Sequence, residues 1–147
     1  MAIVSYLPAI VVSALTLATT APAAATGGAG PYAVSRACAR DAARTSACQL
    51  VSDYFRAINS DRYPQACAML GERLLSESGG PECPRFLAFA GRQHFAILTA
   101  QRPVAGRVHV IVALELRELD HFRVLDWMAV IGLEGDTLKI LDTRRLT

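Results

Sequence analysis

The chain has 147 residues, of which 52% are hydrophobic and 19% are charged, and its formal net charge at pH 7 is +2. So small an excess of positive charge gives no argument for a nucleic-acid partner or a membrane surface. The length suits one domain rather than several.

An apolar leader opens the chain. Residues 2–20 are almost entirely apolar or small, and residues 21–25 (APAAA) have the small-residue spacing of a secretory cleavage site. Cleavage is expected after Ala25, with Ala23 as the second choice. Because no Lys or Arg precedes the run, an uncleaved membrane anchor over residues 3–19 is the alternative. We expect a secreted or extracytoplasmic protein without stable membrane insertion after cleavage, divided into a signal peptide (1–25), a flexible start with a short helical arm (26–46) and one domain (47–147).

Four cysteines follow the leader, which agrees with an oxidising compartment and two disulfides. Three connectivities are possible. Cys67 lies on a predicted helix and Cys83 follows a Ser-Gly-Gly-Pro turn, so a bridge between them would tie two helices together. This pairing leaves Cys38 for Cys48. Ten residues of continuous helix would separate that pair by about 15 Å, beyond the ~7 Å limit for a disulfide, so the helix must break between them.

Three helices are predicted before the sheet. Apolar residues recur at helical spacing over residues 47–58, and Ser46 with Gln49 forms a capping box at the start. A second helix, opened by a proline, covers residues 64–77, and Pro84 opens a short third one.

Four strands follow, the first at residues 94–99 and the others at 108–117, 122–133 and 137–146. Apolar and polar residues alternate along the second strand, which is the pattern of a half-buried strand. Helices on one face of such an antiparallel meander make an α+β domain.

The first long hairpin sets the faces of the sheet. A two-residue turn at residues 120–121 would place Leu114 opposite Trp127 on an apolar face. A slip of one residue would destroy the agreement between strands. The other face carries Glu115, Arg117, Asp126 and Lys139. It also carries apolar residues, which predict a homodimer through this face: Ile111, Ala113, Met128, Val130 and Leu141.

The last strand raises the question of a pocket. A two-residue turn at residues 135–136 would set Ile131 opposite Ile140, and the same register puts Asp142 and Arg144 on the apolar face. Because buried carboxylates need partners, this pair is either the rim of a pocket or a surface ion pair at the sheet edge.

The hydrophobic pattern resembles the nuclear transport factor 2-like superfamily, which includes SnoaL-type cyclases and ketosteroid isomerases. Residues 50–61 (LVSDYFRAINSD), then Tyr63 and residues 66–70 (ACAML), are similar to its opening, and residues 127–140 to its last hairpin. The resemblance covers about residues 48–146. It is closest to small exported bacterial members, in which a cysteine on the second helix and another just before the third are typical.

The resemblance implies a cystatin-like cone, in which three N-terminal helices pack on a curved four-stranded antiparallel sheet with a pocket at the open end. Tyr54 occupies the position of the oxyanion-donor tyrosine of ketosteroid isomerases. The second donor of those enzymes would fall at residues 129–131, which hold no carboxylate. The resemblance therefore does not extend to the isomerase mechanism, and the alternative role for Tyr54 is a core aromatic.

Two classes of function stay open. The first is a non-catalytic exported module that binds a small apolar ligand or a partner protein. The second is an enzyme that uses Tyr54 and Asp142 for acid–base catalysis on an apolar substrate. The missing carboxylate favours the first. We expect a mostly apolar pocket, and the candidate residues that line it are Tyr54, Trp127, Asp142 and Arg144. The alternative is that large side chains fill the cone and leave no pocket.

No cofactor or metal is expected. The sequence has no CxxC or HExxH spacing, and His94, His109 and His121 are scattered. The cysteines are assigned to disulfides, which removes them as nucleophiles.

Overall fold

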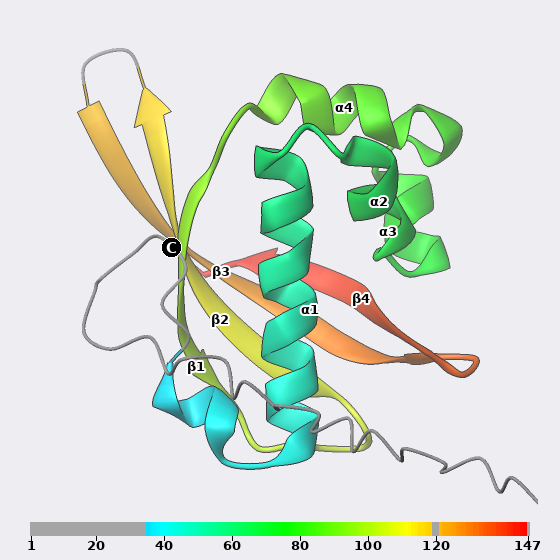
Figure 1. The fold of residues 1–147 in the computed structure, drawn as a ribbon, viewed down its shortest axis with the longest axis vertical. Coiled ribbons are helices and arrows are strands. Elements are labelled where there is room, and N and C mark those ends of the chain that lie inside the picture. Colours follow the sequence, from blue (N-terminus) through cyan, green and yellow to red (C-terminus); the bar gives the residue numbers. More distant parts are fainter. Residues whose placement is uncertain (1–34, 119–120, 147) are drawn as a thin grey trace, which may run out of the picture.

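Helices fill the first part of the chain and strands the second in the computed structural model, which describes residues 35–118 and 121–146 (Figure 1). The predicted signal peptide and the residues up to 34 lie outside this range. The helices are η1 (Arg36–Ala39), α1 (Ala42–Asn59), α2 (Tyr63–Ala68), α3 (Glu72–Glu77), η2 (Gly80–Glu82) and α4 (Cys83–Ala90). The strands are β1 (His94–Ala100), β2 (Val108–Glu118), β3 (His121–Glu134) and β4 (Thr137–Arg145).

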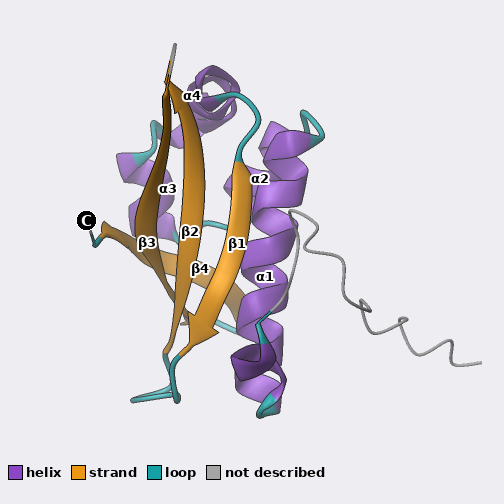
Figure 2. Cartoon of the chain, turned by 90° about the vertical axis from the view of Figure 1, so that its left-hand side faces the viewer, coloured by secondary structure: helices purple, strands orange, loops and turns teal. Residues whose placement is uncertain are grey.

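The strands form one open antiparallel sheet in the order β1-β2-β3-β4, which confirms the predicted α+β class. Figure 2 shows α1 along one side of the sheet. We name this side the inner face and the opposite side the outer face. In Figure 1, α2 and α4 lie beside one end of α1, and α3 lies near β4.

The core lies between α1 and the inner face. Phe55 of α1 stacks on Phe95 of β1 with ring centroids 4.6 Å apart, and it meets the edge of Trp127 at 5.5 Å. Val108, Val110 and Val112 of β2 are buried in this core and Leu114 packs against it, which confirms the faces expected from the alternation along these residues. The buried strand residues of the core include Ile97, Val108, Val110, Val112, Ala129, Ile131 and Ile140.

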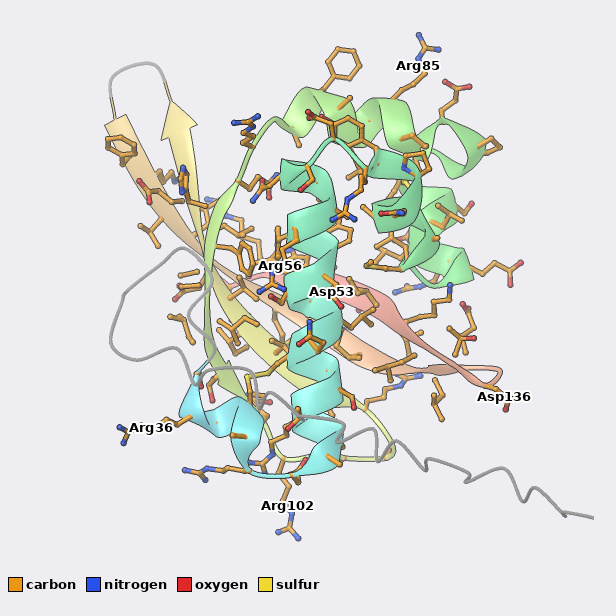
Figure 3. All side chains as sticks on the ribbon, viewed as in Figure 1. Arg36, Asp53, Arg56, Arg85, Arg102 and Asp136 are labelled. Atoms are coloured by element: carbon orange, nitrogen blue, oxygen red, sulfur yellow. A yellow bond between two sulfur atoms is a disulfide. The ribbon has the colours of Figure 1, made fainter. Side chains whose placement is uncertain are left out.

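The opposite side of α1 is polar. Asp53 and Arg56 lie on the side of the helix away from the sheet (Figure 3), where their side chains form an ion pair of 3.9 Å. Val51 and Phe55 are buried. The helix is therefore amphipathic, as its sequence predicts.

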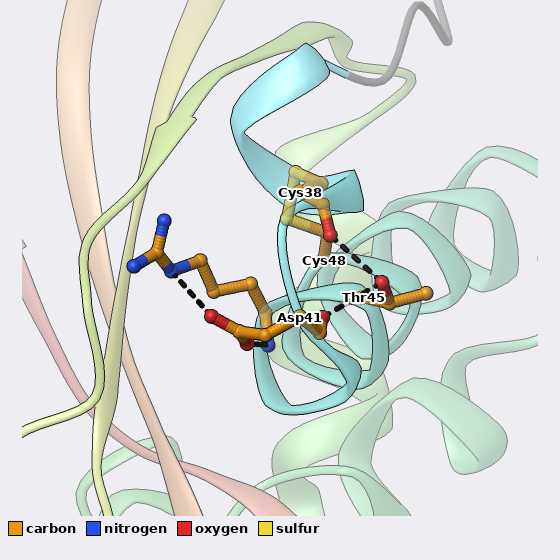
Figure 4. A network of polar contacts seen from close by, with 5 residues as sticks. Cys38, Asp41, Thr45 and Cys48 are labelled. Carbon is orange, nitrogen blue, oxygen red and sulfur yellow. Dashed lines mark hydrogen bonds and ion pairs between the residues drawn. A yellow bond between two sulfur atoms is a disulfide. The ribbon is translucent and has the colours of Figure 1, made fainter.

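The start of α1 differs from the prediction. The helix begins at Ala42 rather than Ala47, because Asp41 caps it by accepting a hydrogen bond of 2.8 Å from the N–H of Arg44. Thr45 donates its hydroxyl to Cys38 O at 2.8 Å and lies 2.9 Å from Asp41 O (Figure 4). The capping box at Ser46 and Gln49 is therefore wrong, although a helix break between Cys38 and Cys48 is present.

The end of α1 lies where the sequence places it. Asp61 has the left-handed backbone angle φ 58°. Its N–H donates to Ile58 O at 3.1 Å, while the N–H of Arg62 donates to Ala57 O at 2.8 Å. These two bonds form a Schellman motif, which satisfies carbonyls that the helix end would leave without partners.

The predicted helix over residues 64–77 is wrong, because it is divided into α2 and α3. Leu70 forms a parallel bridge to Ile140 at the free edge of β4. The N–H of Gly71 donates to Ile140 O at 2.8 Å, and the N–H of Ile140 donates to Met69 O at 2.9 Å. These backbone groups pair with the strand edge instead of continuing the helix, which also covers part of that edge.

Both predicted disulfides are present. Cys38 pairs with Cys48, which joins η1 to α1, and their Cα atoms are 6.0 Å apart. Cys67 pairs with Cys83, which joins α2 to α4, with a Cα separation of 6.1 Å. Two disulfides indicate an oxidising, extracytoplasmic compartment.

The first hairpin has a different register from the predicted one. Glu118 pairs with His121, so Val112, and not Leu114, is opposite Trp127. The expected turn at residues 120–121 is wrong because His121 belongs to β3. A shift of two residues returns each side chain to the same face, so the face assignment survives the error. The predicted pairing of Ile131 with Ile140 is confirmed.

Candidate functional site

The last strand contains a β-bulge. Ile131 pairs with Ile140, but Val130, the residue just before Ile131, pairs with Asp142. Leu141 therefore has no partner on β3 and is an extra residue of β4. Bulges re-aim the side chains that follow them and are frequent beside functional sites.

Two glycines accommodate the bulged leucine. A Cβ atom on Gly132 would lie 2.8 Å from Leu141 Cδ1, and one on Gly71 would lie 3.1 Å from Leu141 Cδ2. The side chain of Leu141 therefore lies in a slot between the two glycines, and a Cβ atom at either position would require it to shift.

The bulge corrects the prediction for Asp142 and Arg144. They pair with Val130 and Met128, which belong to the outer face, and all four residues line the same cleft there. The sequence placed both charged residues on the apolar inner face. That placement is wrong because one inserted residue reverses every later side chain in a strand.

Asp142 joins two arginines. Its Oδ1 lies 3.1 Å from Nη2 of Arg73 on α3, and its Oδ2 lies 3.3 Å from Nε of Arg144. Oδ1 also accepts a bond of 2.9 Å from the N–H of Thr143. Partial burial raises the pKa of Asp142, but the bonds from Thr143 and Arg144 and the two arginine charges outweigh it, so the pKa is lowered. The carboxylate therefore stays ionised to a lower pH than an ordinary carboxyl group does, and the ion pairs weaken only as the pH falls through its lowered pKa.

These residues form part of a cleft of about 470 Å³ on the outer face, which we name the outer cleft. Its floor is apolar and consists of Met128, Val130 and Leu141; Val130 is only 6% exposed. The polar residues around the floor come from α3, the turn before β2 and three strands, and they are Arg73, Arg107, His109, Glu134, Asp142 and Arg144.

Arg107 differs from the other two arginines of the outer cleft. Among the residues that the structure describes, its guanidinium has no hydrogen bond and no ion pair. Glu134 is already engaged, since both of its carboxylate oxygens lie 3.0 Å from the N–H of Glu72. The cleft thus contains three guanidinium groups and two carboxylates, and both carboxylates already accept from protein donors.

A second large cleft, also of about 470 Å³, lies between the first turns of α1 and the inner face; we name it the inner groove. None of its lining residues is charged. It is lined by Ala42, Ala43, Ser46, Ala47, Pro103, Gly106, Val108, Ile131, Leu133 and Leu138. Two smaller clefts lie over α4 and between α1 and α2.

Tyr54 and Trp127 line none of these four clefts. Both are partly buried and pack against the core, and Tyr54 meets the edge of Phe55 with ring centroids 5.3 Å apart. Burial raises the pKa of Tyr54 from its ordinary 10.0 to about 12. The four predicted pocket residues are thus divided between the two faces of the sheet, with Asp142 and Arg144 on the outer one.

The histidines stay apart. His94 is exposed and pairs with Glu115, and Nδ1 of His109 lies 3.2 Å from Oε1 of Gln101. Within residues 35–118 and 121–146, no cluster of three or more His, Cys, Asp or Glu side chains could hold a metal ion.

Sequence reasoning missed Arg73, Arg107 and the slot for Leu141. One signal was available, because a glycine inside a strand pattern often marks a bulge or a close approach, and Gly132 is such a residue. No local signal connects Gly71 or Arg73 with a strand about 70 residues later.

No described helix combines the length and the apolar character that crossing a bilayer requires. Comparisons with known protein families, with characterised proteins and with solved structures find no match to this chain.

Proposed function

We propose that this chain is an exported, non-catalytic binding module and that it holds a small, uncharged apolar ligand in the inner groove. The observation that carries the proposal is Leu133, whose side chain belongs to the core-facing side of the sheet but is 66% exposed. Helix α1 covers Ile131, two residues earlier, but leaves this end of the hairpin open.

The size and chemistry of the inner groove support a small molecule. Its volume lies within the range of about 300–1,000 Å³ that small-molecule sites occupy. The wall from α1 consists of three alanines and a serine, which leave room beside the helix. Because no charged side chain lines the groove, binding an uncharged apolar ligand there removes no water from an ionised group of the protein.

The order of helices and strands is compatible with the nuclear transport factor 2-like superfamily, and we propose membership on the resemblance described above. That resemblance implies a pocket at the open end of the cone. We further propose export with cleavage near Ala25, supported by the apolar leader and the two disulfides. A mature N-terminus near Thr26, found by mass spectrometry of the exported protein, is the expected result; an intact Met1 in the membrane fraction would contradict it.

Catalysis by Tyr54 and Asp142 is not the function that the geometry favours. Tyr54 packs on the inner side of the sheet, and Asp142 lines the outer cleft. One small substrate cannot contact both.

The uncharged probe N-phenyl-1-naphthylamine tests the proposed function, since its fluorescence rises in an apolar site. We expect saturable binding that Leu133→Asp weakens by about tenfold or more, because the variant places a charge beside the ligand. Leu98→Asp is the matched control: Leu98 is also an exposed strand leucine, but it lies in β1 and does not line the groove. Equal binding by both variants, or no saturable binding by the wild type, would reject the groove as the site.

A further inference from the structure

We propose that the outer cleft is a second binding site, which takes a small organic carboxylate with an apolar body. The site is distinct from the inner groove, because the two clefts share no lining residue and lie on opposite faces of the sheet.

The Arg107 guanidinium, which has no partner within the described part of the chain, supplies the anchor for the carboxylate. Arg73 and Arg144 already share Asp142, whereas Arg107 has no partner among the described residues. A guanidinium presents parallel N–H donors that match the two oxygens of a carboxylate. Arg107 is therefore the guanidinium of this cleft that has all of its donors uncommitted among the described residues.

The backbone and the sheet hold Arg107 in place. Its N–H and carbonyl exchange hydrogen bonds of 3.0 and 2.9 Å with Val104, across a tight turn in which Ala105 and Gly106 have left-handed φ angles. A Cβ atom on Gly132 would lie 3.4 Å from Arg107 Cγ, so the stem of the arginine lies close above the sheet at that glycine. The same glycine thus gives room to Leu141 in the floor and to Arg107 at the rim.

The floor of the outer cleft supplies the rest of the specificity. Met128, Val130 and Leu141 offer an apolar surface beside the cationic rim. A strongly hydrated inorganic anion gains nothing from that surface, whereas the body of an organic carboxylate is removed from water there. The charges point the same way, because one guanidinium in excess of the two carboxylates matches a single negative charge.

Octanoate is a suitable probe, and octanol is its uncharged counterpart of the same chain length. Because octanol, as an uncharged apolar molecule, also suits the inner groove, the two probes are compared at the outer cleft by NMR titration. At low ionic strength we expect octanoate to bind there at least about tenfold more tightly than octanol. In amide NMR spectra, octanoate should shift the resonances of Gly132, Leu141 and Asp142. Binding should weaken as salt is added, since the rim is open to solvent.

The variant Arg107→Gln removes the guanidinium and its charge and keeps a polar, uncharged side chain. We expect octanoate binding to fall by about tenfold or more, to the level of octanol. Arg102→Gln is the matched control, since Arg102 is an exposed arginine of the same loop that points away from the fold (Figure 3) and does not line the cleft. It should bind octanoate like the wild type.

Three results would overturn the proposal: equal octanoate binding in Arg107→Gln and the wild type, equal affinity of octanoate and octanol for the outer cleft, or resonance shifts confined to the inner groove. Because Arg107 does not line the inner groove, Arg107→Gln should bind N-phenyl-1-naphthylamine like the wild type. The proposal for the outer cleft can therefore be rejected while the proposed function stands, and the proposed function can be rejected while the proposal for the outer cleft stands.

Discussion

At the scale of single residues, Asn59 connects the helical layer to the sheet. Its side chain donates to Gln93 O at 2.8 Å and accepts from the N–H of Gln93 at 2.7 Å. Because Asn59 is the last residue of α1 and Gln93 directly precedes β1, this pair fixes the end of the helix against the first strand.

We predict that Asn59→Ala lowers the free energy of unfolding by about 1–2 kcal/mol, since two partly buried backbone groups lose their partner. Urea unfolding measures the loss. Gln49→Ala is the control, because the hydrogen bond from the Gln49 side chain to Asp53 is exposed to solvent, and a change within about 0.5 kcal/mol is expected. Equal losses in the two variants would show that the Asn59 clamp contributes nothing.

At the scale of elements, the Cys67–Cys83 disulfide stabilises the short helices that precede the sheet. Helices α2 and α3 have six residues each, too few to be stable alone. The Cys67–Cys83 bond ties α2 to α4, and the backbone bonds of Gly71 and Met69 to Ile140 tie the segment between α2 and α3 to β4. Arg73 reaches the outer cleft because these tethers hold α3 at the strand edge.

We predict that replacing Cys67 and Cys83 together by serine lowers the free energy of unfolding by about 3 kcal/mol, the loop-entropy value for a separation of 16 residues. The same replacement of Cys38 and Cys48, with a separation of 10, should cost about 2.7 kcal/mol in that treatment. The two variants should differ more in ligand binding than in stability. Losing Cys67–Cys83 should weaken octanoate binding, because α3, which carries Arg73, is then held less firmly at the strand edge. The stability prediction would be contradicted if the Cys67/Cys83 variant lost less than about 1 kcal/mol in the free energy of unfolding.

At the scale of the whole molecule, the outer face has two unlike halves. The half beside β4 is the outer cleft with its charged rim. The other half exposes Leu98, itself an extra residue in β1, and Val124, which are 48% and 62% exposed. Ile111 and Ala113 lie between them and are half-buried. A second copy of the chain that covered Leu98, Ile111, Ala113 and Val124 would leave the cleft open.

We predict a homodimer through this half of the outer face, which light scattering of the mature protein should detect at high concentration. Leu98→Asp should shift the protein to a monomer because it places a charge in the interface, while Leu133→Asp on the inner face should leave the dimer intact. A monomer at the highest soluble concentration of the wild type would rule the interface out.

Much of the fold can be predicted from the sequence because it depends on how apolar residues repeat along each helix or strand. Alternation along β2 and helical spacing along α1 determine which side chains are buried, and both survive errors in the exact turns. The pairing of Ile131 with Ile140 follows from a short turn, and the two disulfides follow from the positions of the cysteines among predicted helices.

Tertiary contacts decided the candidate site. The helix over residues 64–77 breaks because Gly71 pairs with Ile140, about 70 residues away, and Leu141 is extruded into a slot formed by Gly71 and Gly132. That single extra residue moves Asp142 and Arg144 to the outer face, beside Arg73 and Arg107. A period of two cannot reveal an insertion that depends on a distant segment, so the sequence by itself determined the layers and the faces, and the packing of α3 against β4 determined which charges meet.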